Sequence, residues 1–171
     1  QYYENEGGKR FVKKSRELFP RTSWGAMGIK VFDFNNDGRM DIFITDMHSD
    51  MFENLPPERE KQKAAVHPPD QILGGTADAF VFGNALFHNA GGGKFEEVSD
   101  RLGVENYWPW GPSIGDLNAD GWDDIFIASS MNYPHRYGVN ALLLNDRGET
   151  FRDAEFLVGI EPRRDGRTLT P

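Results

Sequence analysis

The chain has 171 residues, which is enough for a domain with its own hydrophobic core. Its formal net charge is −8 at pH 7, and such an acidic surface argues against nucleic acid as a partner. The sequence has no uninterrupted apolar run of about eighteen residues, so no membrane span is predicted. It also has no cysteine, which excludes disulfides and thiolate metal sites.

Residues 1–22 are predicted to be the last two strands of one repeat unit. The apolar pair Tyr2-Tyr3 stands ahead of the run Asn5–Phe11, which starts with asparagine, contains two glycines and ends on phenylalanine. Glycine supplies positive φ and asparagine tolerates it, so such a run is typical of a hairpin turn. We therefore expect one strand before this turn and a Phe-led strand after it.

Residues 23–105 are predicted to be a complete unit. Its β-branched and aromatic runs have strand length, and an acidic, glycine-containing loop at residues 33–41 separates the first two. Four short strands are expected: Ile29–Phe32, Asp41–Thr45, Ala85–Phe87 and a last strand led by Phe95. The turn Asn89–Phe95 repeats the pattern of the first turn.

An insertion interrupts this unit at about residues 47–80. The proline pairs Pro56-Pro57 and Pro68-Pro69 bracket a charged stretch around Glu58–Lys63 that is long enough for two or three helical turns. We expect a mostly non-β segment on the surface. It is either a solvated insertion or a partner-binding loop, because insertions in repeat proteins tend to gather on one face.

Residues 106–161 are predicted to be a third unit, with an acidic loop at residues 116–124. Its expected strands are Pro112–Ile114, Asp124–Ala128, Ala141–Leu144 and a strand led by Phe151, and its Asn-led turn is Asn145–Phe151. Residues 162–171, which include the basic turn Arg163–Arg167, are expected to connect to a next unit.

Four short strands per unit, repeated, are typical of the blades of a β-propeller. The predicted fold class is therefore all-β: a propeller segment with two complete four-stranded blades, one partial blade and one insertion. An extended β-solenoid is the structural alternative. Because a propeller needs at least four blades to close, we expect further blades from a longer protein, from other copies or from other chains.

The two acidic loops, 33–41 and 116–124, carry the clearest chemistry in the chain. In each, carboxylate or amide side chains stand at loop positions 1, 3, 5 and 9, and glycine stands at position 6. Ca²⁺ takes six to eight oxygen ligands, and a tight loop with an oxygen side chain at every second residue supplies them. The competing interpretation is a pair of Asp-Gly turns that make only local hydrogen bonds.

Together, the loops and the Asn-led turns resemble FG-GAP/VCBS repeats, the blades of integrin α-subunit propellers. The loop followed by Ile-Phe-Ile is especially similar to the cartilage-acidic-protein (ASPIC/UnbV-like) branch. The resemblance implies a seven-bladed propeller with Ca²⁺ between the first and second strands of a blade. Matched residue by residue, it implies side-chain ligands Asp33, Asn35, Asp37 and Asp41 at one site and Asp116, Asn118, Asp120 and Asp124 at the other, with the carbonyls of Arg39 and Trp122 completing the shells. Asparagine at position 3 replaces the aspartate of many members and lowers the ligand charge.

From this resemblance and the loops we predict a non-catalytic module that binds two Ca²⁺ ions and serves protein–protein recognition, adhesion or assembly. Cytosolic Ca²⁺ is scarce, so an extracytoplasmic location (secreted, periplasmic or cell surface) is expected. The alternatives are a lectin-like propeller that binds glycans and part of a calcium-dependent, polysaccharide-active enzyme. An enzyme would need an acid or base that does not bind the metal, and the sequence identifies no such residue.

Aromatic residues supply the other candidate contacts. Six of the nine Trp and Tyr residues fall in one part of the sequence: Tyr107, Trp108, Trp110, Trp122, Tyr133 and Tyr137. They either stack on sugars or partners or fill the gap between blades, and Trp122 is the best single candidate for an exposed contact. The four histidines, His48, His67, His88 and His135, have no metal-ligand spacing.

Overall fold

The computed structural model describes residues 1–46, 70–106, 108–129, 131–132, 136–137 and 139–161. Within them the chain folds mainly as strands, in two four-stranded antiparallel sheets and three two-stranded pairs. In both four-stranded sheets, the strands of the sheet lie side by side in the order in which they follow one another along the chain. The all-β prediction of propeller-like blades is confirmed, and separate four-stranded sheets exclude the β-solenoid alternative.

The first four-stranded sheet has the order β4-β5-β7-β8. Its strands are β4 (Ala26–Phe32), β5 (Asp41–Asp46), β7 (Ala85–Gly91) and β8 (Lys94–Glu97). The acidic loop 33–40 joins the first two strands, as the sequence predicts, and the Asn-led turn joins the last two. The single-turn helix α3 (Ser99–Leu102) follows the sheet, and Gly103 ends it in the left-handed conformation.

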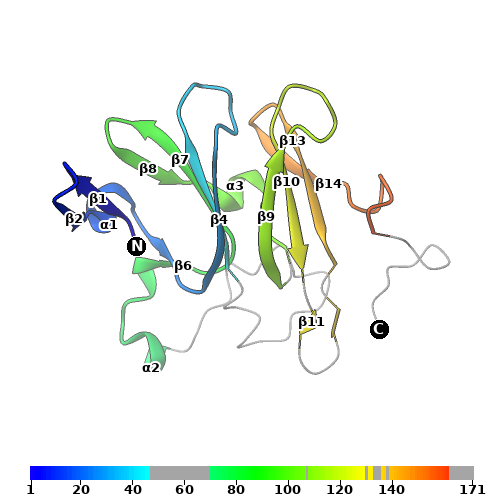
Figure 1. Ribbon diagram of the computed structural model, residues 1–171. Helices are drawn as coiled ribbons and strands as arrows, with labels where there is room; N and C mark the ends of the chain where they lie inside the picture. The colour runs from blue at the N-terminus through cyan, green and yellow to red at the C-terminus, as the bar shows by residue number, and fades with distance from the viewer. Residues whose placement is uncertain (47–69, 107, 130, 133–135, 138, 162–171) are drawn as a thin grey trace.

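The second four-stranded sheet repeats this arrangement. Its strands are β9 (Pro109–Gly115), β10 (Asp124–Ser129), β13 (Ala141–Asp146) and β14 (Thr150–Asp153), and a short hairpin of β11 (Met131–Asn132) and β12 (Arg136–Tyr137) lies between β10 and β13. The two large sheets stand side by side, with β4 and β5 against β9 (Figure 1).

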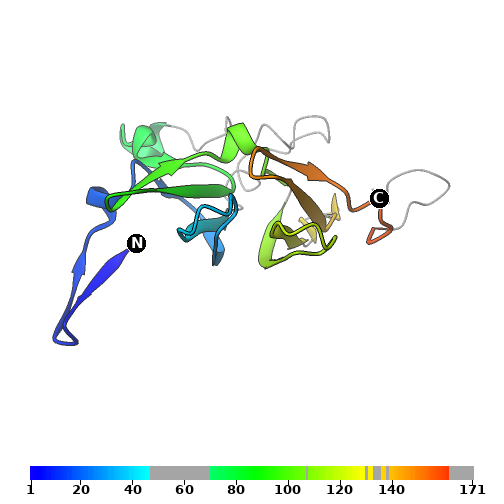
Figure 2. The ribbon, with the colours of Figure 1, turned by 90° about the horizontal axis from the view of Figure 1, so that it is seen from above.

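The remaining elements surround the first sheet. They are the hairpin of β1 (Tyr3–Glu6) and β2 (Arg10–Lys13), helix α1 (Ser15–Leu18), the parallel pair of β3 (Thr22–Ser23) and β6 (Phe80–Val81), helix α2 (Asp70–Leu73) and the 3-10 turn η3 (Ala77–Ala79). The β1–β2 hairpin projects to one side of the sheets (Figure 2). Most of the predicted insertion, the 162–171 connector and three of the four histidines lie outside the described residues.

The main core lies between the two large sheets. Successive side chains of a strand point to opposite faces, so each strand divides its apolar residues between two sides. The residues that meet in this core are Phe32, Phe34, Phe43, Leu86, Val98, Leu102, Val104, Ile125, Ile127, Ala141, Leu143 and Phe151. Burial of aliphatic and aromatic side chains from both sheets therefore holds the two blades together.

Gly28 allows β4 to approach the second sheet closely. A Cβ atom on Gly28 would lie 2.5 Å from Pro112 Cδ and 2.8 Å from the Trp110 carbonyl oxygen. Beside it, the Thr45 hydroxyl donates to the same Trp110 oxygen at 2.6 Å and accepts from the Gly28 N–H at 2.9 Å. The two blades are thus joined by a polar contact as well as by the core.

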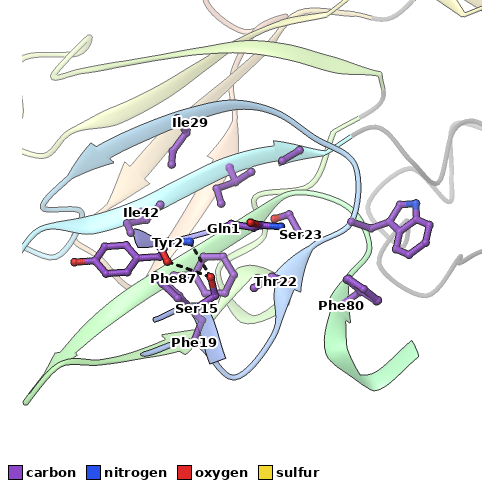
Figure 3. Close-up of a pocket in the computed structure, with 13 residues that line it drawn as sticks. Gln1, Tyr2, Ser15, Phe19, Thr22, Ser23, Ile29, Ile42, Phe80 and Phe87 are labelled. Atoms are coloured by element: carbon purple, nitrogen blue, oxygen red, sulfur yellow. Dashed lines mark hydrogen bonds between the residues drawn. The ribbon is translucent and has the colours of Figure 1, made fainter. Parts of the chain in front are cut away.

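The other face of the first sheet borders a hollow of about 470 Å³ (Figure 3). Its lining comes from β4, β5, β6, β7, the first two residues of the chain and the segment that leads from the β1–β2 hairpin to β4. It is mainly apolar, with Phe19, Ile42, Ile44 and Phe87 among its residues. Ile29, which lines it, is 60% exposed. This face of the sheet therefore leaves apolar side chains exposed.

Candidate metal centre

The two acidic loops lie at the same end of the two sheets. Loop 33–40 joins β4 to β5, and loop 116–123 joins β9 to β10 (Figure 1). Both loops take the same backbone path, because Gly38 and Gly121 have φ of 82° and 90° at position 6. Asn36 and Ala119, at position 4, also have positive φ. Glycine meets the requirement of position 6 without the steric cost that a side chain would bring.

Oxygen atoms of positions 1 and 3 converge within each loop. In the first loop, Asp33 Oδ1 and Asn35 Oδ1 both accept from the Asp37 N–H, at 3.0 and 3.3 Å. In the second, the corresponding oxygens both accept from the Asp120 N–H, at 2.9 and 3.0 Å. In each loop, therefore, the side-chain oxygens of positions 1 and 3 lie beside the same backbone N–H group.

The aspartates at position 9 anchor the loops to the sheets. Asp41 and Asp124 are fully buried. One carboxylate oxygen of each accepts from the N–H of position 2, and the other accepts from the N–H of Asn89 or Asn145 on the third strand, at 2.7 and 2.8 Å. In all, seven hydrogen bonds of one loop have counterparts in the other.

The backbone N–H groups of the position 7 residues take part in the loop hydrogen bonds, which leaves their carbonyl oxygens as predicted ligands. The N–H groups of Arg39 and Trp122 donate to the position 5 aspartates. The expectation that Trp122 is an exposed contact is wrong, because its side chain is half-buried beside the turn at Gly148. Trp110 is the more exposed tryptophan, at 42%. Two other members of the aromatic group, Tyr107 and Tyr133, lie outside the described residues.

The loops of the two sheets also contact each other. The Asn36 amide donates to the Gly121 carbonyl oxygen at 3.1 Å. The Asn145 amide donates to the carbonyl oxygens of Phe34 and Asp123, at 2.8 and 3.0 Å. Sequence reasoning missed these contacts. The recurrence of asparagine at the head of each turn identified Asn145 as a turn residue, but nothing in the pattern identified its bond to the neighbouring blade.

A family profile described as FG-GAP-like repeat matches residues 1–44 and 70–127, more than half of the chain. The chain belongs to the FG-GAP-like repeat family. Searches of curated proteins and of solved structures gave no significant match. FG-GAP-like repeats form β-propeller modules that are in general non-enzymatic, serve protein–protein interaction and are typical of extracellular domains. None of the helices within the described ranges is long and apolar enough to cross a membrane.

The two loops of this FG-GAP-like chain differ in their charged neighbours. Arg39 Nη2 lies 2.6 Å from Asp37 Oδ2, and His88 Nδ1 lies 3.1 Å from Asp41 Oδ1. Burial alone would raise the pKa of the Asp37 carboxyl, but hydrogen bonds from Arg39 and Asn35 and the charges of Arg39 and His88 outweigh it and lower that pKa. In the second loop, Trp122 stands at the position of Arg39.

The second loop instead concentrates uncompensated negative charge. Burial raises the pKa of the Asp123 carboxyl, and the charges of Asp116, Asp124 and Asp33 raise it further. Asp33 belongs to the first loop, so the two loops lie close enough to interact electrostatically. A bound cation would remove this repulsion.

The donor set fits a hard cation. Each loop presents carboxylate and amide oxygens, which are the ligands that Ca²⁺ prefers. Among the described residues, no three His, Cys, Asp or Glu side chains are gathered as a metal-binding group on their own. Each of the six aspartates predicted as ligands accepts at least one backbone N–H, but a carboxylate has about four acceptor positions and retains some for an ion. A cation would therefore draw in side chains that the loop backbone already positions.

Proposed function

We propose that this chain is a calcium-binding, non-catalytic β-propeller module for protein–protein recognition, adhesion or assembly. The observation that supports it best is the equivalence of the two loops. Two segments far apart in sequence use the same residue types to make seven corresponding hydrogen bonds. Membership of the FG-GAP-like repeat family supports the recognition role.

Calcium in this proposal stabilises the blades. Asp33, Asn35, Asp37 and Asp41, with the Arg39 carbonyl, would hold one ion, and Asp116, Asn118, Asp120 and Asp124, with the Trp122 carbonyl, would hold the other. When free Ca²⁺ is ten times the dissociation constant, each site adds about 1.4 kcal/mol to the free energy of unfolding. The proposed location is extracytoplasmic, where Ca²⁺ is plentiful enough to fill such loops.

Glycan binding receives less support from the positions of the tryptophans. Trp108 immediately precedes β9, whereas Trp122 lies in the loop that follows it. A seven-residue strand spans about 23 Å, so these side chains come from opposite ends of the sheet and do not form one stacking platform.

Isothermal titration calorimetry tests the calcium proposal. We expect two Ca²⁺ per chain, one after Asp33→Ala with Asp37→Ala, and one after Asp116→Ala with Asp120→Ala. The double variant Glu4→Ala with Glu6→Ala removes two exposed carboxylates from β1 and is the matched control, which should retain both ions. Absence of binding heat in the unaltered chain, measured well above micromolar Ca²⁺, would refute the proposal.

A further inference from the structure

We propose that the two calcium loops form one coupled unit, in which Asn145 and the turn that it begins link occupancy of the second loop to the geometry of the first. This inference rests on the proposed calcium binding. Asn145 is a positioning residue in it, because its side chain bonds to the loops without supplying a ligand.

Asn145 holds parts of both loops at once. Its backbone N–H donates to Asp124 Oδ1, a proposed ligand of the second site, at 2.8 Å. Its side-chain amide donates to the carbonyl oxygens of Asp123 and, across the blade interface, Phe34. Asn145 is only 2% exposed, so water offers little replacement for these bonds. Phe34 stands between the proposed ligands Asp33 and Asn35, and a displacement of its carbonyl would move the first loop.

The turn that follows Asn145 touches the first loop directly. Asn145 Oδ1 accepts from the Gly148 N–H at 2.7 Å. A Cβ atom on Gly148 would lie 3.0 Å from Asn35 Cα and 3.4 Å from Trp122 Cζ3. Gly148 therefore lies between a proposed ligand residue of the first site and the position 7 residue of the second.

Asn89 supplies an internal comparison. At the corresponding turn of the first blade, its N–H donates to Asp41 Oδ1, its side-chain amide to the Met40 carbonyl oxygen, and its Oδ1 accepts from Gly91. The first two bonds match those of Asn145, whereas Oδ1 of Asn89 accepts from the residue two positions on and Oδ1 of Asn145 from the residue three positions on. These bonds of the Asn89 N–H and side chain all stay within the first blade, so they do not join the two acidic loops.

The coupling is expected to be positive. An ion in the second loop would fix Asp124, and through the N–H bond it would fix Asn145 and the carbonyl of Phe34. The first loop is then already partly ordered before its own ion binds, so less conformational entropy is lost on binding. The Ca²⁺ affinity of the first loop rises without a change in its ligands. By linkage, an ion in the first loop raises the affinity of the second by the same factor.

Calorimetric Ca²⁺ titration measures this factor when the intact chain is compared with two single-loop variants. These are Asp33→Ala with Asp37→Ala, which leaves only the second loop, and Asp116→Ala with Asp120→Ala, which leaves only the first. We expect the product of the two association constants in the intact chain to exceed the product from the single-loop variants at least about fivefold. Asn145→Ala should bring the ratio close to one, and Asn89→Ala should leave it high. A ratio near one in the unaltered chain, or a high ratio that survives Asn145→Ala, would overturn the coupling.

Gly148→Ala and Gly92→Ala form a second, matched test that does not depend on the stability of the Asn145 variant. Both glycines have positive φ, but a Cβ on Gly92 meets no atom within 4 Å. Each is combined with Asp116→Ala and Asp120→Ala, which disable the second loop. The Ca²⁺ affinity of the first loop should then fall for Gly148→Ala and not for Gly92→Ala. Equal effects would contradict the proposed contact. Loss of all Ca²⁺ binding in the unaltered chain would refute the proposed function, whereas two independent sites would refute only the coupling.

Discussion

Asp124 is expected to have two separable roles, as an acceptor that holds the loop to the sheet and as a calcium ligand. Its side chain is fully buried and accepts from the N–H groups of Leu117 and Asn145, at 2.9 and 2.8 Å. Asp124→Ala removes both acceptors. Asp124→Asn keeps one carbonyl-type acceptor and a similar shape, but it loses the negative charge that a cation needs.

The magnitude follows from these contacts. A buried N–H without a partner costs about 1 to 3 kcal/mol. The bond from the Asn145 N–H is buried and the bond from the Leu117 N–H is partly buried, so one full and one partial loss together should cost about 2 to 4 kcal/mol in Asp124→Ala without Ca²⁺. At 2 to 4 °C per kcal/mol, the melting temperature falls by about 4 to 16 °C. Asp124→Asn should cost about half as much.

Thermal unfolding followed by circular dichroism, with chelator and with excess Ca²⁺, checks both roles. In chelator the Ala variant should be clearly less stable than the Asn variant. With Ca²⁺ at ten times the dissociation constant, both should lose about 1.4 kcal/mol of the calcium-dependent stabilisation. A full calcium response in Asp124→Asn would show that Asp124 is not a ligand, and an unchanged melting temperature of Asp124→Ala in chelator would refute the anchoring role.

Three further changes probe the core, a surface charge and the first loop. Phe43→Ala should lower the free energy of unfolding, measured with urea, by about 3 to 5 kcal/mol, because Phe43 is fully buried between the sheets. Phe126→Ala, at the corresponding but half-buried position of β10, should lower it by less. Equal losses would contradict the described core. Asp100 is exposed, but partial desolvation and the charge of Glu97 raise the pKa of its carboxyl, so its ionised form opposes folding. Asp100→Asn should therefore melt higher than the unaltered chain at pH 7, and the difference should vanish as the pH falls below the ordinary Asp pKa of about 3.9. Persistence of that difference at low pH would refute the electrostatic cause. Arg39→Leu removes the guanidinium beside Asp37 and should raise the Ca²⁺ affinity of the first loop in calorimetry, whereas a fall would show that Arg39 assists the site.

Local pattern predicted most of the fold. The run Asp41–Thr45 was expected as a strand, and the structure extends it by one residue, to Asp46. The Asn-led turns and the acidic loops lie where they were expected, because glycine and asparagine at turn positions restrict the backbone without help from tertiary contacts. The blade boundaries, the branch within the family and the calcium itself remain predictions.

The parts that were missed depend on distant contacts or on very short elements. The bond from Asn145 to Phe34 joins residues 111 apart in sequence, and a single chain without an alignment gives no sign of it. Helix α3 has only four residues, too few for a helical period to appear in the sequence. Trp122 is half-buried because the turn of its own blade packs beside it, which its sequence position does not reveal.

The central claim is that both loops hold Ca²⁺, and crystals grown with Ca²⁺ test it most directly. An anomalous difference map should show one peak in each loop, with oxygen ligands at about 2.3 to 2.6 Å from Asp33, Asp37 and Asp41 and from the corresponding residues of loop 116–124. The account would be contradicted if neither loop showed a peak at saturating Ca²⁺ and the loop carboxylates were bonded only to backbone N–H groups and water.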